Sequence, residues 1–224
     1  MNERLLKFSS ITKKVWMALL GIFLLLFLMV HLGINLCLLR EDGGRWFNDA
    51  AHFMGTNYVV KIFEVALFAG FILHILLGII LQIKNWLSRP VRYRVSNRST
   101  TPFFSKYMIY TGGIVLFFLV LHMFNFYFIK LGWVSNTNFT PEGHPNFYLI
   151  ARELFALPLY SILYVVLFIG LGFHLFHAFV SAFQTLGLNH KTYTPAIEIA
   201  AKIYAILIPL GFSIIPIYFL FFYK

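Results

Sequence analysis

The sequence predicts an all-α integral membrane protein whose 224 residues form a single membrane domain of five transmembrane helices. Its composition supports this fold class, because 60% of the residues are hydrophobic, 12% are charged and the mean hydropathy is +0.79. Five apolar stretches also reach the length of about 20 residues that a helix needs to cross a hydrocarbon core. The polar segments between them are too short to bury a core of their own, so no soluble domain is expected.

The predicted spans cover residues 15–39, 58–83, 107–130, 155–182 and 200–222. Lysines precede the first span and no small-residue cleavage site follows it, which indicates a retained helix rather than a signal peptide. Twelve Lys and Arg residues lie on the side of the N-terminus and six on the opposite side. Since positive residues favour the cytoplasmic side, we expect a cytoplasmic N-terminus in a multi-pass protein of the inner membrane of the cell.

The net charge of +10 raises the question of nucleic-acid binding. The basic residues stand at the ends of apolar segments rather than in one stripe interleaved with aromatics, so topology explains them and no nucleic-acid partner is expected. The single cysteine, Cys37, lies in an apolar run. It can build neither a disulfide framework nor a cysteine-ligated metal cluster, so any redox centre must use other ligands.

Five histidines lie within the predicted spans: His31 in the first, His74 in the second, His122 in the third, and His174 and His177 in the fourth. An ionisable residue at membrane depth costs a few kcal/mol unless it has a partner or a function. A lone histidine on an apolar helix is usually a hydrogen-bonded structural residue. Histidines on four consecutive helices favour a shared function instead.

Depth sorts four of these histidines into two levels. His31 and His122 each fall about eight residues before the outer end of their span, and His74 and His174 about nine residues before the inner end. Two histidines at each of two levels are what two bis-histidine haems b stacked across the bilayer require. Polar contacts between helices would also explain intramembrane histidines, but they give no reason for the two levels.

Small neighbours decide between His174 and His177, since a porphyrin lying against a helix needs small residues one turn above and below its ligand. These positions hold Gly70 and Gly78 around His74, Gly170 and Ala178 around His174, but Phe173 and Ser181 around His177. We therefore expect His174 to be the inner ligand. His177 is expected to hydrogen-bond a haem propionate or a neighbouring helix.

Four motifs then stand in order along the chain: SSITKK at 9–14, HLGINL at 31–36, His74 ten residues after Glu64, and HLFHAFVSAFQTLGLN at 174–189. With these motifs on five helices, the chain resembles the cytochrome b subunit of dihaem succinate dehydrogenases and fumarate reductases over nearly its whole length. That resemblance places His31 and His122 at a distal haem iron, and His74 and His174 at a proximal one. It departs at Gly172, where some members of the family carry a glutamate, so a proton route through that position is not expected here.

The resemblance implies a subunit of a succinate:quinone oxidoreductase, serving the tricarboxylic acid cycle or anaerobic respiration. In such an enzyme the chain anchors a flavoprotein subunit and an iron–sulfur subunit on the cytoplasmic side, and the dicarboxylate site lies on another subunit. Electrons then pass between the iron–sulfur subunit and a membrane quinone, with menaquinone expected for members that hold two haems. The sequence leaves open whether the physiological direction is succinate oxidation or fumarate reduction.

Candidate partners for haem propionates gather at the inner boundary: Ser9, Ser10, Lys13, Lys14, Arg98, Ser105 and Lys106. Topology alone is an equal explanation for the basic ones. Candidate quinone residues lie at the outer side: Asn48, Asp49, His52 and Glu64. Glu64 lies about 9 Å inside the second span and suits the acceptance of protons from a quinol, although it could instead pair with Lys61 or meet interfacial water. Asp49 and His52 could equally be solvated loop residues.

Two rival functions remain. Another quinone-linked dihaem cytochrome b, or a transmembrane ferric reductase, would use a different histidine spacing, and several such proteins place two ligands on one helix. A carrier or channel with polar helix contacts would hold no cofactor and would be colourless. The distribution of four histidines over four helices favours the cytochrome b anchor over both.

Overall fold

The structure, a computed structural model, describes residues 10–87 and 108–222. Its five long helices are α1 (Ser10–Asn35), α3 (Tyr58–Leu87), α5 (Met108–His122), α8 (Pro158–Thr185) and α9 (Thr194–Phe221). Short helical segments join them: η2 (Leu36–Leu39), α2 (Arg45–Thr56), the π-helical turn η3 (Met123–Tyr127), α6 (Phe128–Lys130) and α7 (Phe147–Ala156). The described part of the chain contains no strand, so the predicted all-α membrane architecture is confirmed.

Five helical stretches are long and apolar enough to cross a membrane: Ile11–Leu39, Tyr58–Leu87, Met108–Lys130, Pro158–Thr185 and Thr194–Phe221. Five predicted boundaries differ from these by three to six residues: those at residues 15, 83, 155, 182 and 200. The fourth span begins at Pro158 rather than at residue 155, because Leu157 is extended and proline occupies the first turn of α8. The fifth begins at Thr194 rather than at residue 200, again with a proline in its first turn.

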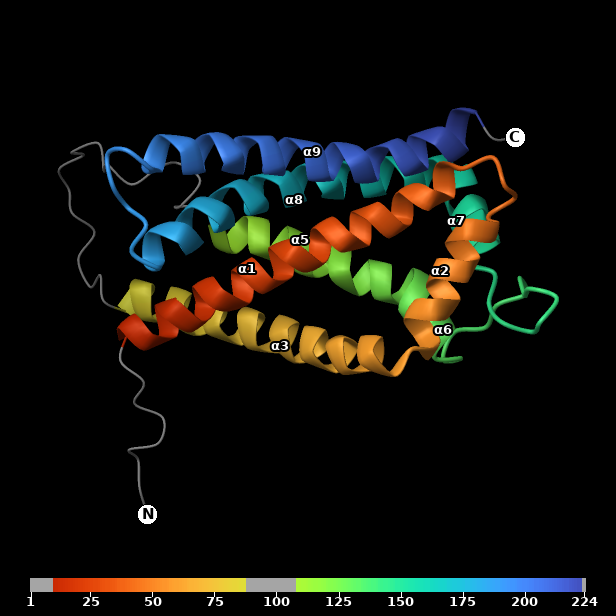
Figure 1. Ribbon diagram of the computed structural model, residues 1–224, viewed down its shortest axis with the longest axis horizontal. Helices are drawn as coiled ribbons and strands as arrows, with labels where there is room; N and C mark the ends of the chain where they lie inside the picture. The colour runs from red at the N-terminus through yellow and green to blue at the C-terminus, as the bar shows by residue number, and fades with distance from the viewer. Residues whose placement is uncertain (1–9, 88–107, 223–224) are drawn as a thin grey trace, which may run out of the picture.

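The five spans form one bundle (Figure 1), in which α1 crosses obliquely over its neighbours and α3 lies opposite α9. The short helices α2, α6 and α7 gather at one end of the bundle, where α1 and α9 also finish. We call this the outer end, following the sidedness predicted from the charges. The opposite end, where α1 and α9 begin and α3 finishes, is the inner end.

Two helices at the outer end were not predicted, because both lie in segments taken as loops. Gly43 and Gly44, both with positive φ, lead into α2, and a side chain at Gly44 would collide with the ring of Tyr148. Asn48 on α2 then ties the two helices together: its amide donates to Asn146 Oδ1 at 2.9 Å, and its oxygen accepts from the Tyr148 backbone N–H at 3.1 Å. Asn48, a candidate quinone residue in the sequence, is therefore committed to joining α2 to α7.

The buried core lies on one side of the bundle. Seven residues of α8 and eight of α9 are buried, whereas Gly70 is the one buried residue of α3 and α5 has none. Aromatic stacking joins α8 to α9, with the rings of Phe168 and Phe212 5.4 Å apart. Apolar side chains cover α3 on the outside, as lipid contact requires.

Gly172 is required where α8 approaches α9. A Cβ at this position would lie 2.9 Å from the backbone oxygen of Ala205 and 3.2 Å from Cγ of Pro209. No longer side chain fits between the two helices without moving them apart. The packing of α8 on α9 thus gives a physical reason for the glycine, and it leaves no room at this position for the glutamate of the resembled family.

Candidate cofactor site

Four histidine rings face one another in two pairs. His31 of α1 lies opposite His122 of α5, with ring centroids 5.8 Å apart, and His74 of α3 lies opposite His174 of α8, with centroids 6.4 Å apart. The rings of each pair are nearly perpendicular, at 85° and 75°. The structure thus brings together the same partners that the two levels in the sequence had matched, from four different helices.

Aromatic rings enclose the outer pair. Phe27 stacks on His31 with centroids 5.2 Å apart, and Phe118 stacks on His122 with centroids 5.7 Å apart. Phe126 and Phe212 complete the enclosure, 5.1 Å from the ring of His122 and 5.8 Å from that of His31. These rings supply no hydrogen-bond acceptor in their planes, so the surroundings of the pair are apolar.

The inner pair has a different environment. Thr111 Oγ1 lies 3.4 Å from His174 Nδ1, and a Cβ at Gly112 would lie 3.7 Å from the same ring. A Cβ at Gly21 of α1 would lie 4.0 Å from the His74 ring. His174, rather than His177, is the histidine of α8 that meets His74.

Two of these histidines carry a buried nitrogen with no partner. Nδ1 of His74 and Nδ1 of His122 are enclosed and have no hydrogen bond. A buried ring nitrogen without a hydrogen bond costs about 1–3 kcal/mol, and native proteins rarely leave one so. Each pair therefore contains one buried nitrogen for which the described residues offer no hydrogen bond.

The two imidazoles of each pair limit which metal ion or prosthetic group could bind there. A bare metal ion needs three or four protein ligands, and the described residues contain no group of three His, Cys, Asp or Glu that could hold one. A haem supplies four nitrogens of its own and needs two axial ligands. Two imidazoles bound about 2 Å from one iron have ring centres about 6 Å apart, which both pairs match. The residues present therefore fit a haem at each level better than a free metal ion.

The small residues expected to flank the porphyrins are in contact with other helices. A Cβ at Gly70 would lie 3.3 Å from Phe23, and one at Gly78 3.3 Å from Met17, both in α1. A Cβ at Gly170 would lie 2.7 Å from Ile114 in α5. In this structure the three glycines admit the ends of side chains, which swing between rotamers more readily than backbone moves.

The expected propionate partners lie mostly beyond the described residues. Ser9, Arg98, Ser105 and Lys106 fall outside them, as does the side chain of Ser10. Lys14 is described and is exposed in the first turns of α1, at the inner end. Its position suits a group at the membrane boundary, whether propionate or lipid phosphate.

Glu64 lies in a network at the outer end. The Tyr127 hydroxyl donates to Glu64 Oε1 at 2.6 Å, and the Lys130 ammonium donates to both carboxylate oxygens, at 3.1 and 2.9 Å. The partner is thus Lys130 rather than Lys61, whose ammonium lies 5.9 Å from the ring centre of Tyr58. Sequence reasoning missed Tyr127 and counted Lys130 for topology alone, although both stand near the end of the third span, close to the depth of Glu64.

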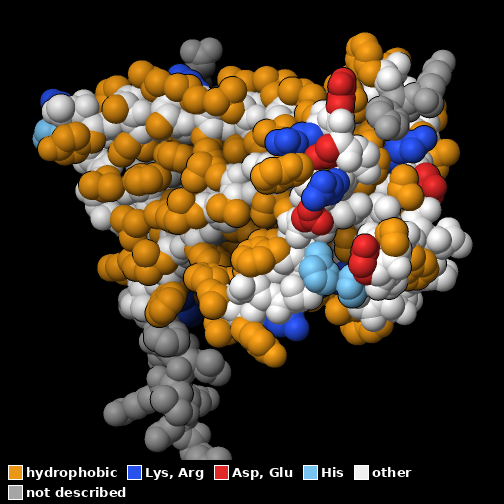
Figure 2. Space-filling view, turned by 45° about the vertical axis from the view of Figure 1, so that its right-hand side comes forward, with side chains coloured by type: hydrophobic (Ala, Val, Ile, Leu, Met, Phe, Trp, Pro, Cys, Tyr) orange, Lys and Arg blue, Asp and Glu red, His pale blue; other side chains and the backbone are white. Residues whose placement is uncertain are grey.

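Asp49 and His52 lie apart from this network on the exposed face of α2. Asp49 makes a long ion pair with Arg45, at 4.0 Å, and the ring of His52 lies 4.5 Å from that of His144 in the 131–146 loop. Figure 2 shows histidine side chains among charged ones toward one end of the molecule, beside a wide apolar surface. Among the described residues no hydrogen bond or ion pair joins Asp49 or His52 to Glu64.

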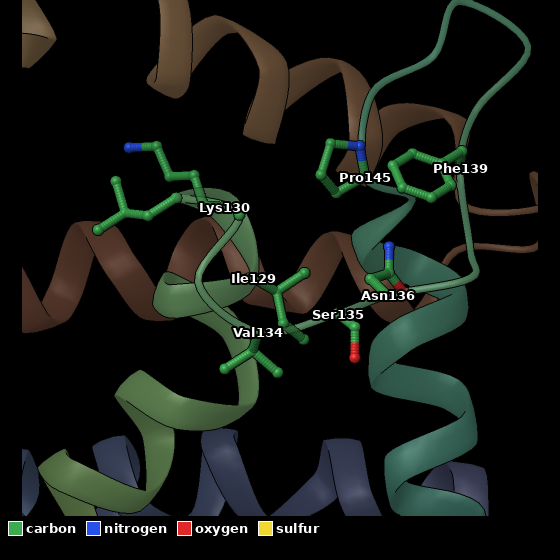
Figure 3. A pocket seen from close by; sticks show the side chains of 9 residues that line it. Ile129, Lys130, Val134, Ser135, Asn136, Phe139 and Pro145 are labelled. Atoms are coloured by element: carbon green, nitrogen blue, oxygen red, sulfur yellow. The ribbon is translucent and has the colours of Figure 1, made fainter.

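A pocket of about 460 Å³ lies beside the same network, between the end of α6 and the 131–146 loop. Ile129, Val134, Phe139 and Pro145 supply its apolar lining (Figure 3). The Lys130 side chain points away from Phe139 and Pro145. With its charge on Glu64 instead, Lys130 gives the pocket no cation to fix a ligand.

Comparison with models of protein families, with curated proteins and with solved structures finds no match to this chain. The function is therefore inferred from the residues themselves. They form two facing histidine pairs at two depths and one carboxylate network at the outer end. The fold that carries them is that of a multi-pass, all-α membrane protein.

Proposed function

We propose that this chain is the dihaem cytochrome b anchor of a succinate dehydrogenase or fumarate reductase. His31 and His122 would hold the outer haem, and His74 and His174 the inner one. The observation that supports this most directly is the meeting of four histidines from four helices in two pairs, at the ring separations that two ligands of one haem iron require. A bound haem supplies one-electron transfer. Two haems at two depths would provide a route for electrons across the membrane.

The chain's own residues would hold and insulate this route. The rings of Phe27, Phe118 and Phe212 surround the outer pair and keep water from it. A dry surrounding strengthens every electrostatic interaction of the bound group. At the inner end, the basic loops would dock the iron–sulfur subunit and, through it, the flavoprotein subunit.

Quinone chemistry belongs at the outer end in this proposal, with menaquinone the expected quinone. Oxidation of a quinol releases protons, and a carboxylate near the outer histidine pair can accept them. Glu64 supplies that carboxylate, with Tyr127 and Lys130 as its donors. Asp49 and His52 lie on the exposed face of α2, where they would exchange protons with water rather than with the quinone.

The haem content of the purified chain tests the first part. A pyridine haemochrome assay should give two haems per chain, both six-coordinate and low-spin. His31→Ala and His122→Ala should each remove the same haem, and His74→Ala and His174→Ala the other, while His177→Ala keeps both. One haem or none in the unsubstituted chain would refute the proposal, and loss of the inner haem in His177→Ala alone would reassign its ligand.

Glu64→Gln tests the second part in the assembled complex. The substitution keeps the volume and a hydrogen-bonding group but removes the proton acceptor, so quinol-linked turnover should fall at least about tenfold. Haem content and succinate oxidation with a soluble dye should stay near normal. Unchanged quinone turnover would exclude Glu64 from the reaction.

A further inference from the structure

The residues that contact Glu64 reach it through an irregular turn. The helix α5 ends at His122, the π-helical turn η3 covers Met123–Tyr127, and α6 carries Lys130. In an α-helix, residues five apart, such as His122 and Tyr127, point about 140° away from each other. Hydrogen bonding from i to i+5 instead makes five residues close to one full turn. The π turn therefore lets one chain segment present His122 to His31 and Tyr127 to Glu64.

Neighbouring helices hold this turn on two sides. The Asn125 amide donates to the hydroxyl of Tyr164, a fully buried residue of α8, at 2.8 Å. On the other side, the ring of Tyr127 lies 4.8 Å from that of Phe68, one turn beyond Glu64 on α3. The turn thus has a defined partner on each flank.

Lys130 completes the network from the next turn. Its ammonium lies 2.9 Å from Glu64 Oε2. Its aliphatic part lies close to α2, where a Cβ at Gly55 would be 3.7 Å from Cε of Lys130. Both side chains of the ion pair are less than one-third exposed, at 31% and 22%. An opposite charge at this distance favours the ionised carboxylate, whereas a half-buried carboxyl without it would take up a proton.

We propose that Lys130 and Tyr127, placed by the π turn Met123–Tyr127, are positioning residues that keep Glu64 an ionised, oriented carboxylate at the outer end of the bundle. The inference depends on the proposed function for its catalytic meaning, since an ionised Glu64 is the form able to accept a proton from a quinol. The proton would leave the quinol oxygen and bind a Glu64 oxygen, and Lys130 would stay charged throughout. Tyr127 would fix the carboxylate by donating its own hydroxyl hydrogen.

Infrared spectroscopy of the purified chain tests the positioning role without any quinone. The C=O stretch of a protonated carboxyl is assigned to Glu64 by its absence in Glu64→Gln. Between about pH 6 and pH 8 the unsubstituted chain should lack this band and Lys130→Met should show it. Lys130→Arg should restore the ionised state. Tyr127→Phe should keep the carboxylate ionised but shift its stretching frequencies, since one donor is lost.

Deletion of Phe124 tests the turn itself. Removing this one residue converts the π turn into regular α-helix and leaves Tyr127 four residues after His122, within about 40° of it around the helix axis, so this variant should keep both the outer haem and an ionised Glu64. Deletion of both Met123 and Phe124 rotates Tyr127 and Lys130 by about 100° relative to His122, and this variant should retain the outer haem yet show the protonated Glu64 band of Lys130→Met. Phe124→Leu, at a side chain that is 52% exposed, keeps the residue count and should behave as the unsubstituted chain.

Turnover of the assembled complex separates this inference from the proposed function. Lys130→Met should lower kcat for quinol by about tenfold or more with KM little changed, and Lys130→Arg should recover most of it. If Lys130→Met leaves both the infrared band and the pH profile of turnover unchanged, the positioning role is wrong. If the band appears as expected but Glu64→Gln turns over quinol normally, the positioning role stands and the proposed role of Glu64 in quinone chemistry fails.

Discussion

The two sides of the bundle are built differently. On one side α8 and α9 pack directly against each other, with buried aromatic rings and with Gly172 touching the backbone of α9. On the other side α3 and α5 contribute a single buried residue between them, Gly70, although each carries one of the four paired histidines. Of the four paired histidines, the close-packed side of α8 and α9 carries only His174, whereas α3 and α5 carry His74 and His122.

The two sides differ in whether protein side chains alone complete the packing. Close packing between α8 and α9 needs no further group, since van der Waals contact and small residues suffice to join helices in lipid. The histidine pairs at the interface with α3 and α5 leave buried nitrogens without hydrogen bonds. A large apolar cofactor at each level would supply the missing contacts.

The largest expected effect comes from removing the cofactor. In a His31→Ala/His74→Ala chain, amide hydrogen exchange in α3 and α5 should accelerate about 100-fold or more, because a tightly bound group protects only the elements that it contacts. Exchange in α9 should change far less. His177→Ala, which keeps both pairs, is the control. Equal acceleration on both sides of the bundle would show that the two sides do not differ in this way.

A substitution in the close-packed side should destabilise the fold directly. Gly172→Leu places a side chain against Ala205 and Pro209 and should lower the free energy of unfolding in detergent by about 1–3 kcal/mol. Gly113→Leu on α5, where a Cβ would meet nothing within 4 Å, should change it by less than about 0.5 kcal/mol. Equal losses from the two variants would contradict the contrast in packing.

The hydrogen bond that links the two sides of the bundle should contribute less to the free energy of unfolding. Tyr164 of α8 accepts a hydrogen bond from Asn125 in the π turn. Tyr164→Phe leaves the Asn125 amide unpaired and should cost about 1 kcal/mol of unfolding free energy. A double-mutant cycle with Asn125→Leu isolates the pair, and a coupling energy near zero would show that the two sides are joined by other contacts.

The smallest effect is expected at the exposed loop of the outer end. A hydrogen bond from Thr140 lowers the pKa of Glu142 below its usual value, with smaller contributions from a backbone hydrogen bond and from His144 and His52. A lowered folded-state pKa adds stability that is present above the ordinary pKa of 4.5 and is lost as pH falls through the folded value. Carboxyl ¹³C NMR should show Thr140→Val returning the pKa toward 4.5, and no change would exclude the Thr140 contact.

Much of the architecture could be predicted because it depends on local properties of the chain. Hydropathy over about 20 residues located the five spans, and a rise of 1.5 Å per residue placed His31 level with His122 and His74 level with His174. The boundaries at Pro158 and Thr194 were less accurate, because prolines in a first turn set them rather than hydropathy. The helices α2 and α7 were missed because short amphipathic segments carry a weak hydropathy signal and are stabilised by contacts with each other.

By itself, then, the sequence determined the membrane class, the number of spans and the depths at which the histidines lie. Those features depend on transfer of side chains into lipid and on helix geometry, both of which act within one segment. Only the tertiary structure decided that Glu64 pairs with Lys130 rather than Lys61, and that Gly172 lies against the backbone of α9. Each of these depends on the rotation of one helix about its axis relative to another, which is set by packing between distant segments and, at η3, by one extra residue in a turn.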